Sequence, residues 1–81
     1  MIYLAYADAD LPAQADGPWH EIFLLRPGLA LVDSDESRSR VYHAIKHSLP
    51  AETPVLVAQL DEPPKFKGMA AGALKWARSR S

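Results

Sequence analysis

The clearest strand in the sequence is Pro54-Val55-Leu56-Val57-Ala58-Gln59-Leu60. Its apolar residues occupy both alternating faces, which is typical of a strand that is covered on both sides. A second run of this kind, near the N-terminus, is Ile2-Tyr3-Leu4-Ala5-Tyr6-Ala7. Two such strands predict a sheet with a buried centre, and we expect both segments in its interior.

Two further strand-like runs, Trp19–Leu25 and Leu29–Val32, lie between these segments and are separated by Arg26-Pro27-Gly28. A Pro-Gly pair suits the centre of a type II turn, because proline presets φ and glycine accepts a positive φ. We therefore expect the two runs to form an antiparallel hairpin. The stretch before them, Asp8 to Pro18, is rich in Asp, Ala, Pro and Gly and predicts a loop.

A helix is predicted after the hairpin. Ser34-Asp35-Glu36-Ser37 offers N-cap residues and acids that favour a helix N-terminus, and Pro50 ends the helix after about Leu49. Val41, Ile45 and Leu49 share one face of this helix. The opposite, solvent-facing side carries Glu36, Arg40, His43 and His47, with Glu36 and Arg40 spaced as an ion pair.

A second helical pattern runs from about Phe66 to Arg78. Its apolar stripe consists of Phe66, Met69, Ala70, Ala73, Leu74 and Ala77, with Trp76 at the edge. Residues 1–81 thus form one α+β domain with the element order β-β-β-α-β-α. We expect a four-stranded mixed sheet with two helices packed on it.

Composition limits the cellular context. The chain has no cysteine, so it lacks disulfides and thiolate metal sites, and a small domain without such staples fits the cytoplasm. Its apolar start has no basic leader and is too short for a signal peptide or a membrane span, so we expect no membrane partner.

Charge is unevenly distributed, although the net charge is only −1. Acidic residues dominate the first half, whereas the C-terminal part carries Lys65, Lys67, Lys75, Arg78 and Arg80. A basic stripe beside Trp76 is suited to contact a phosphate backbone, so we name these five residues as candidates for nucleic-acid binding. The alternatives are a mixed solvated surface and basic residues that complement the helix dipole.

Two pairs of side chains are candidate metal ligands. His43 and His47 lie one helical turn apart, a spacing that can hold a transition metal, but a stable site needs further ligands and only Glu36 shares their face. We expect both histidines to be exposed and to bind metal weakly. Asp8 and Asp10 follow the first strand and are candidate Mg²⁺ carboxylates, with an ordinary acidic loop as the alternative.

The overall pattern resembles the small CRISPR-associated endoribonuclease-like proteins of ferredoxin fold. The resemblance lies in Ile2-Tyr3-Leu4-Ala5-Tyr6-Ala7-Asp8, Trp19-His20, Pro54 to Leu60 and the late Trp76. It implies a ferredoxin-like fold, with Asp8 as a metal-binding carboxylate. The chain departs from that family where the loop Asp8 to Pro18 replaces the first helix, so the fold expected is a ferredoxin-like variant without it.

The function expected from these observations is that of a small binding or regulatory module without catalytic activity or cofactor. It would act as a homo-oligomer, most simply a dimer, since both sheet faces need cover and only two short helices are available. The competing arrangement places one helix on each face and needs no partner. The alternative function is a metal-dependent nuclease, using Mg²⁺ at Asp8 and Asp10, or a nucleic-acid-binding protein on the same fold.

Overall fold

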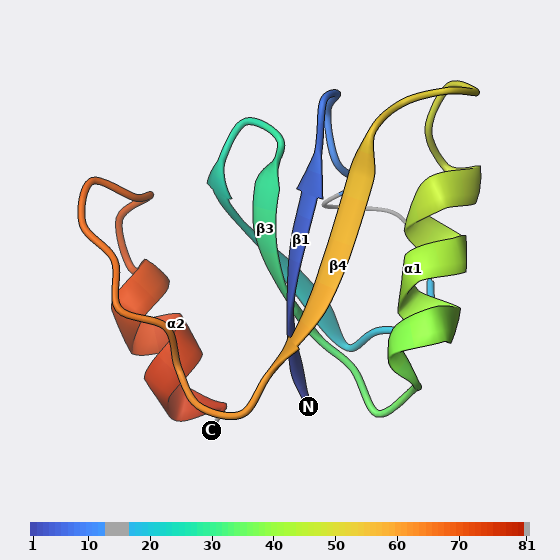
Figure 1. Cartoon of the computed structure of the whole chain (residues 1–81). Coiled ribbons are helices and arrows are strands. Elements are labelled where there is room, and N and C mark those ends of the chain that lie inside the picture. Colours follow the sequence, from blue (N-terminus) through green and yellow to red (C-terminus); the bar gives the residue numbers. More distant parts are fainter. Residues whose placement is uncertain (13–16, 81) are drawn as a thin grey trace.

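The computed structural model describes residues 1–12 and 17–80 and has the α+β architecture and the element order predicted above (Figure 1). The expected loop Asp8 to Pro18 lies partly outside the described residues. No helix within the described part is long and apolar enough to cross a membrane. The elements are β1 (Ile2–Ala7), β2 (Glu21–Arg26), β3 (Leu29–Asp33), α1 (Arg38–His47), β4 (Val55–Leu60) and α2 (Ala73–Ser79).

The four strands form one sheet in the order β2-β3-β1-β4, with antiparallel pairing at every neighbouring pair. The expectation of a mixed sheet is wrong, because every pair of neighbouring strands is antiparallel. β3 and β4, which α1 connects, run parallel, but β1 lies between them, so no two neighbouring strands are parallel. β1 lies in the interior as predicted, and its residue Tyr6 stands opposite Leu29 on one side and Leu56 on the other.

The hairpin of β2 and β3 is confirmed, and Pro27-Gly28 turns the chain. Gly28 has a φ of 79°, as the third position of a type II turn requires. Its carbonyl accepts a hydrogen bond of 2.9 Å from the Ala7 N–H, and a Cβ added to Gly28 would lie 2.5 Å from the Ala7 carbonyl oxygen. Only glycine fits this position, because both its backbone conformation and its close approach to β1 exclude a side chain.

Helix α1 starts as the sequence predicts. The Ser37 hydroxyl caps it by accepting a hydrogen bond of 3.1 Å from the Arg40 N–H, and Val41 and Ile45 are fully buried. The buried Tyr3 side chain donates a 2.6 Å hydrogen bond from its hydroxyl to the Glu36 carbonyl. This contact fixes the start of the helix against the centre of the sheet.

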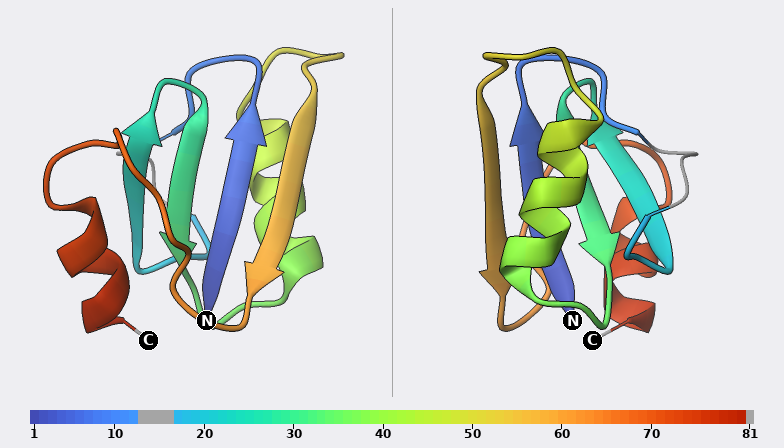
Figure 2. Two further views of the ribbon diagram at one scale, coloured as in Figure 1. Left: turned by 60° about the vertical axis from the view of Figure 1, so that its left-hand side comes forward. Right: turned by 90° about the vertical axis from the view of Figure 1, so that its right-hand side faces the viewer.

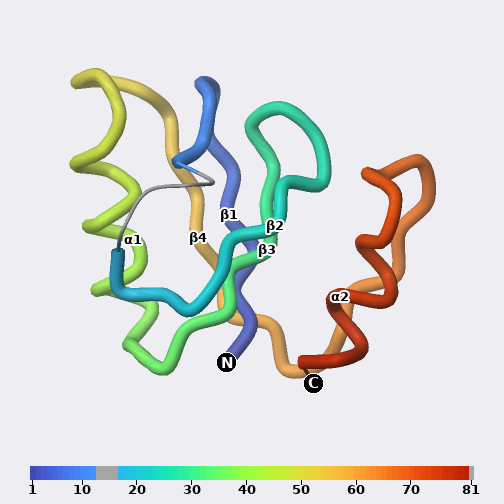
Figure 3. Tube along the Cα trace, turned by 180° about the vertical axis from the view of Figure 1, so that it is seen from behind, coloured from blue at the N-terminus to red at the C-terminus, as the bar shows by residue number. Residues whose placement is uncertain are grey.

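The two helices cover opposite faces of the sheet (Figures 2 and 3). This is the competing arrangement named above, in which each face receives one helix. The core under α1 contains Tyr3, Ala5, Ala7, Leu11, Ile22, Ala30, Val32, Val41 and Ile45. The core under α2 contains Ile2, Leu25, Leu31, Ala73, Trp76 and Ala77.

Helix α2 is much shorter than the predicted helix from about Phe66 to Arg78, because it starts only at Ala73. Gly68 and Gly72 have φ values of 77° and 86°, a left-handed conformation that interrupts a right-handed helix. Phe66 and Met69 pack against the core under α2 as expected, but from an irregular segment. The predicted stripe is also wrong at its edge, since Trp76 is buried and Leu74 is 44% exposed.

The predicted interior position of Pro54 to Leu60 is wrong. β4 is an edge strand, hydrogen-bonded on one side to β1, and none of its six residues is buried. Its position follows from the path of the chain, because the crossover through α1 passes β1 and delivers β4 to the far side of it.

Candidate interaction surface

The open side of β4 is the feature that departs furthest from an ordinary soluble surface. Edge strands in soluble proteins are usually protected from pairing by charged side chains, proline, bulges or a covering segment. Val55 to Leu60 contains neither charge nor proline, and its pairing with β1 has no register shift. Among the described residues no strand pairs with the other side of β4, which lies at the margin of the sheet in Figure 2.

The backbone groups on this open side can be identified from the register. The Asp8 N–H donates to the Pro54 carbonyl at 3.1 Å, so Pro54 belongs to a hydrogen-bonded pair with β1. Because such pairs alternate along an antiparallel ladder, Leu56, Ala58 and Leu60 also direct their backbone groups to β1. Val55, Val57 and Gln59 therefore present their N–H and C=O groups at the open edge.

The face of the sheet next to this edge is only partly covered. Helix α2 lies beside β2 and β3, and the segment that leads to it crosses only one end of β1 and β4 (Figure 2). Tyr6, Leu56 and Ala58 make up what we call the open face, whereas Leu4, opposite Ala58, packs against the core under α2. Tyr6 is 44% exposed and Leu56 52% exposed. Apolar side chains gathered in this way are typical of an interaction surface.

A hollow of about 390 Å³ adjoins the start of β4 on the side of α1. It is lined by the C-terminal half of α1, the turn after it and Val55, and it includes Tyr42, Lys46, His47 and Glu52. This hollow places two basic side chains and one acidic side chain near the first residue of the open edge.

The structure brings the two candidate Mg²⁺ ligands into one shallow hollow. Asp8 and Asp10 are exposed and line a space of about 400 Å³ with Pro27 and Gly28 of the hairpin turn. Within residues 1–12 and 17–80, no group of three or more acidic or histidine side chains is placed to hold a metal ion. The two carboxylates would therefore share Mg²⁺ chiefly with water or substrate.

His43 and His47 are exposed on α1, as predicted, with ring centroids 6.0 Å apart. No further metal-ligating side chain completes a site around them among the described residues. Their expected weak affinity for metal stays a prediction.

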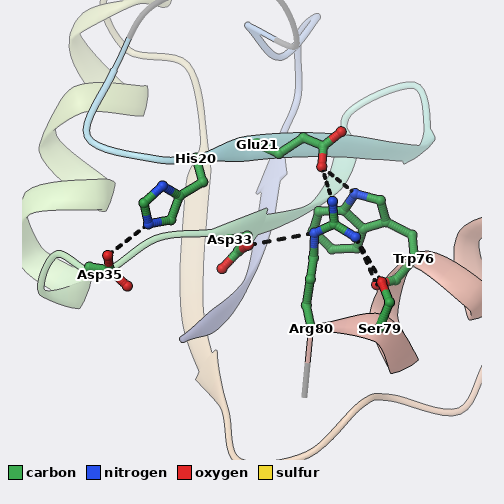
Figure 4. Close-up of polar contacts among 7 residues, drawn as sticks. All are labelled: His20, Glu21, Asp33, Asp35, Trp76, Ser79 and Arg80. Atoms are coloured by element: carbon green, nitrogen blue, oxygen red, sulfur yellow. Dashed lines mark hydrogen bonds and ion pairs between the residues drawn. The ribbon is translucent and has the colours of Figure 1, made fainter.

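The C-terminal basic residues differ in their surroundings. Lys65, Lys67, Lys75 and Arg78 are exposed, but Arg80 is engaged with acidic side chains (Figure 4). Its guanidinium lies 4.2 Å from the centroid of Trp76 and pairs with Glu21 and with Asp33, at 3.5 Å to the latter. The Trp76 indole N–H also donates to Glu21, at 2.9 Å. Arg80 thus fastens α2 to the sheet.

Sequence reasoning overlooked a more basic surface on the outer side of α1. This side carries Arg40, His43, Lys46 and His47, all exposed, and Arg38 is exposed in the first turn of the helix. Arg40 forms a 3.0 Å ion pair with Glu36, whereas Arg38 and Lys46 have no acidic partner within the described part of the chain. The signal was present in the sequence, because residues 37 to 51 contain no acidic side chain.

A His-Asp pair was also overlooked. The His20 Nε2 lies 2.7 Å from the Asp35 Oδ2, beside a hollow of about 200 Å³ that Trp19 and Arg40 also line. The buried Ser34 holds this region together by donating its hydroxyl to the Pro18 carbonyl. Both side chains of the pair are largely exposed, so it contributes little to stability. Fifteen residues separate the partners, and no local sequence pattern links them.

Comparisons with known proteins add no identification: no family model matches the chain, and neither a curated protein nor a solved structure is significantly similar to it.

Proposed function

We propose that this protein is a small binding or regulatory module without catalytic activity, and that it works as a homo-oligomer, most simply a two-fold dimer. The observation that carries the proposal is the mismatch between the sequence of β4 and its position. Five of its six residues are apolar and they occupy both faces, yet the strand lies at an open edge with no residue buried. A second copy would supply the neighbour that the open edge lacks.

Physical arguments support a partner for a domain of this size. A chain of 81 residues buries a modest share of its surface, so pairing of the open β4 edge with a second copy would contribute a large fraction of its total stability. Closed two-fold symmetry is the commonest arrangement of soluble homo-oligomers. The absence of cysteine supports a cytoplasmic location for such an assembly.

Light scattering coupled to size exclusion tests this function across the micromolar concentration range. We expect a mass near twice the 8.9 kDa of one chain, falling toward 8.9 kDa on dilution. A mass that stays at 8.9 kDa at every concentration contradicts the proposal, and means that one helix on each face is sufficient cover.

Nucleic-acid binding is the second candidate, and the basic outer side of α1 supports it. Lys46 on this side and Arg38 in the first turn are exposed and have no acidic partners among the described residues. Tyr42 adjoins Lys46, whose Nζ lies 5.9 Å from the ring centroid. Cations interleaved with an aromatic ring suit a phosphate backbone. Retention on heparin that falls steeply with salt supports this candidate, and elution at low salt opposes it.

A further inference from the structure

We propose that β4 pairs antiparallel with β4 of a second copy, about a two-fold axis perpendicular to the sheet. This inference rests on the proposed dimer and specifies its interface. It joins two four-stranded sheets into one continuous sheet of eight strands. Both α1 helices then lie on one face of the enlarged sheet, and both α2 helices lie on the other.

Charge favours the antiparallel direction. Asp61 and Glu62 follow β4 directly and are exposed. A parallel pairing would bring these carboxylates close to the same residues of the second copy, which repel them. Antiparallel pairing instead places them near the start of the other β4, where the adjoining hollow carries two basic side chains, Lys46 and His47, and one acidic side chain, Glu52.

The alternation of side chains restricts the register. Residues directly opposite each other in an antiparallel pair point to the same face. An axis perpendicular to the sheet keeps the two faces distinct, so Val57, which packs toward α1, cannot stand opposite Ala58, which belongs to the open face. This excludes the register that would overlap all six residues of both strands.

The open backbone groups then select one register. Val55, Val57 and Gln59 direct their N–H and C=O groups outward, as derived above from the pairing with β1. Centring the axis on Val57 pairs Val57 with itself and Val55 with Gln59 of the other copy. All three outward residues of both strands are then in hydrogen-bonded pairs, and no open donor or acceptor of β4 is left unpaired.

The side chains fit this register on both faces. Leu56 stands opposite Ala58 of the second copy, so a large side chain meets a small one and the two open faces become continuous. On the other face the two Val57 side chains meet on the axis, next to the core under each α1. The strand brings no charged side chain into this junction.

Single cysteines test the register, since the chain contains none of its own. In a hydrogen-bonded pair the two Val57 Cα atoms are about 5.5 Å apart, within the range of about 4.4 to about 6.8 Å that a disulfide spans. Val57→Cys should therefore form an intermolecular disulfide under mild oxidation. In the matched control Gln59→Cys the two thiols are offset by four residues, about 14 Å, and should cross-link at least about tenfold more slowly.

A backbone variant gives an independent readout. Gln59→Pro removes one outward N–H that β1 does not use, so the fold should persist, as checked by circular dichroism, while the dimer weakens by about tenfold or more. If the native protein is dimeric but Gln59→Pro leaves the dimer unchanged, or Gln59→Cys cross-links as fast as Val57→Cys, the β4 interface is wrong and the proposed dimer stands. If the native protein is monomeric at every concentration, both proposals fail.

Discussion

Leu56 of β4 stands directly opposite Tyr6 of β1, and both side chains remain about half exposed, at 52% and 44%. Helix α2, which covers the same face of the sheet further along, lies beside β2 and β3 and leaves this pair uncovered (Figure 2). The pair therefore marks the place where the fold of one chain leaves apolar surface without cover.

The first prediction concerns this pair. Replacing Leu56 with Lys places a charge beside the proposed interface and should weaken dimerisation by about tenfold, because a charged side chain at an edge strand opposes pairing. The matched control is Leu74→Lys, at an equally apolar position on α2 that is 44% exposed. Light scattering over a dilution series measures both, and equal dissociation of the two variants contradicts the prediction.

Arg80 should be a stabilising residue although it lies near the end of the chain. Arg80→Ala removes the pairs with Glu21 and Asp33 and the contact with Trp76, so the free energy of unfolding should fall by about 1 to 2 kcal/mol. Urea denaturation measures this change. Lys75→Ala, an exposed position in the same helix, should change it by less than about 0.5 kcal/mol.

In addition, the Arg80 variant should expose Trp76. A red shift of its fluorescence in the Trp19→Phe background reports this exposure. An unchanged spectrum together with unchanged stability means that Arg80 does not fasten α2.

Substitutions of Gly28 and Gly68 distinguish two ways in which a side chain at positive φ lowers stability, backbone strain and a steric clash. Both have a φ near 80°, at 79° and 77°, but a Cβ on Gly28 meets the Ala7 carbonyl oxygen, whereas a Cβ on Gly68 meets no atom within 4 Å. Gly68→Ala should cost about 1 kcal/mol of unfolding free energy and Gly28→Ala about 2 kcal/mol or more. Equal costs by urea denaturation would mean that the contact with β1 is unimportant.

The nucleic-acid candidate predicts that α1 matters more than the C-terminal lysines. Arg38→Gln with Lys46→Gln should reduce the affinity for a duplex about tenfold and lower the salt slope by about 2, since two phosphate contacts are lost. Lys65→Gln with Lys67→Gln removes the same charge and should have little effect. Fluorescence anisotropy at several salt concentrations compares the affinities of the two variants. If the substitutions at Lys65 and Lys67 reduce the affinity more, the nucleic-acid-binding surface lies at the C-terminal segment and not on α1.

The nuclease alternative makes its own prediction. If Asp8 and Asp10 bind Mg²⁺ for catalysis, Asp8→Asn should abolish Mg²⁺-dependent RNA cleavage and leave the melting temperature nearly unchanged, because the side chain is exposed. Gel assays on several RNAs with and without Mg²⁺ provide the measurement. No cleavage by the native protein under any of these conditions retires the alternative.

Local chemistry accounts for the parts of the fold that could be predicted. The Pro27-Gly28 turn, an N-cap within residues 34 to 37 and a strand at β1 with apolar residues on both faces each depend on residues close together in the chain, and each is present in the structure. The candidate sites were less predictable. The pairing of His20 with Asp35 and that of Arg80 with Glu21 join residues far apart in sequence, and no periodic pattern encodes them.

The sequence by itself determined the elements, their order and the hairpin, because hydrophobic periodicity, caps and turn residues act over a few positions. Only the tertiary structure decided that β4 lies at an edge and that α2 leaves Tyr6 and Leu56 uncovered. An apolar strand has the same hydrophobic pattern whether its own chain or a second chain covers it. The pattern therefore indicates only that burial stabilises the strand. Which neighbour supplies that cover depends on the path of the chain between the strands.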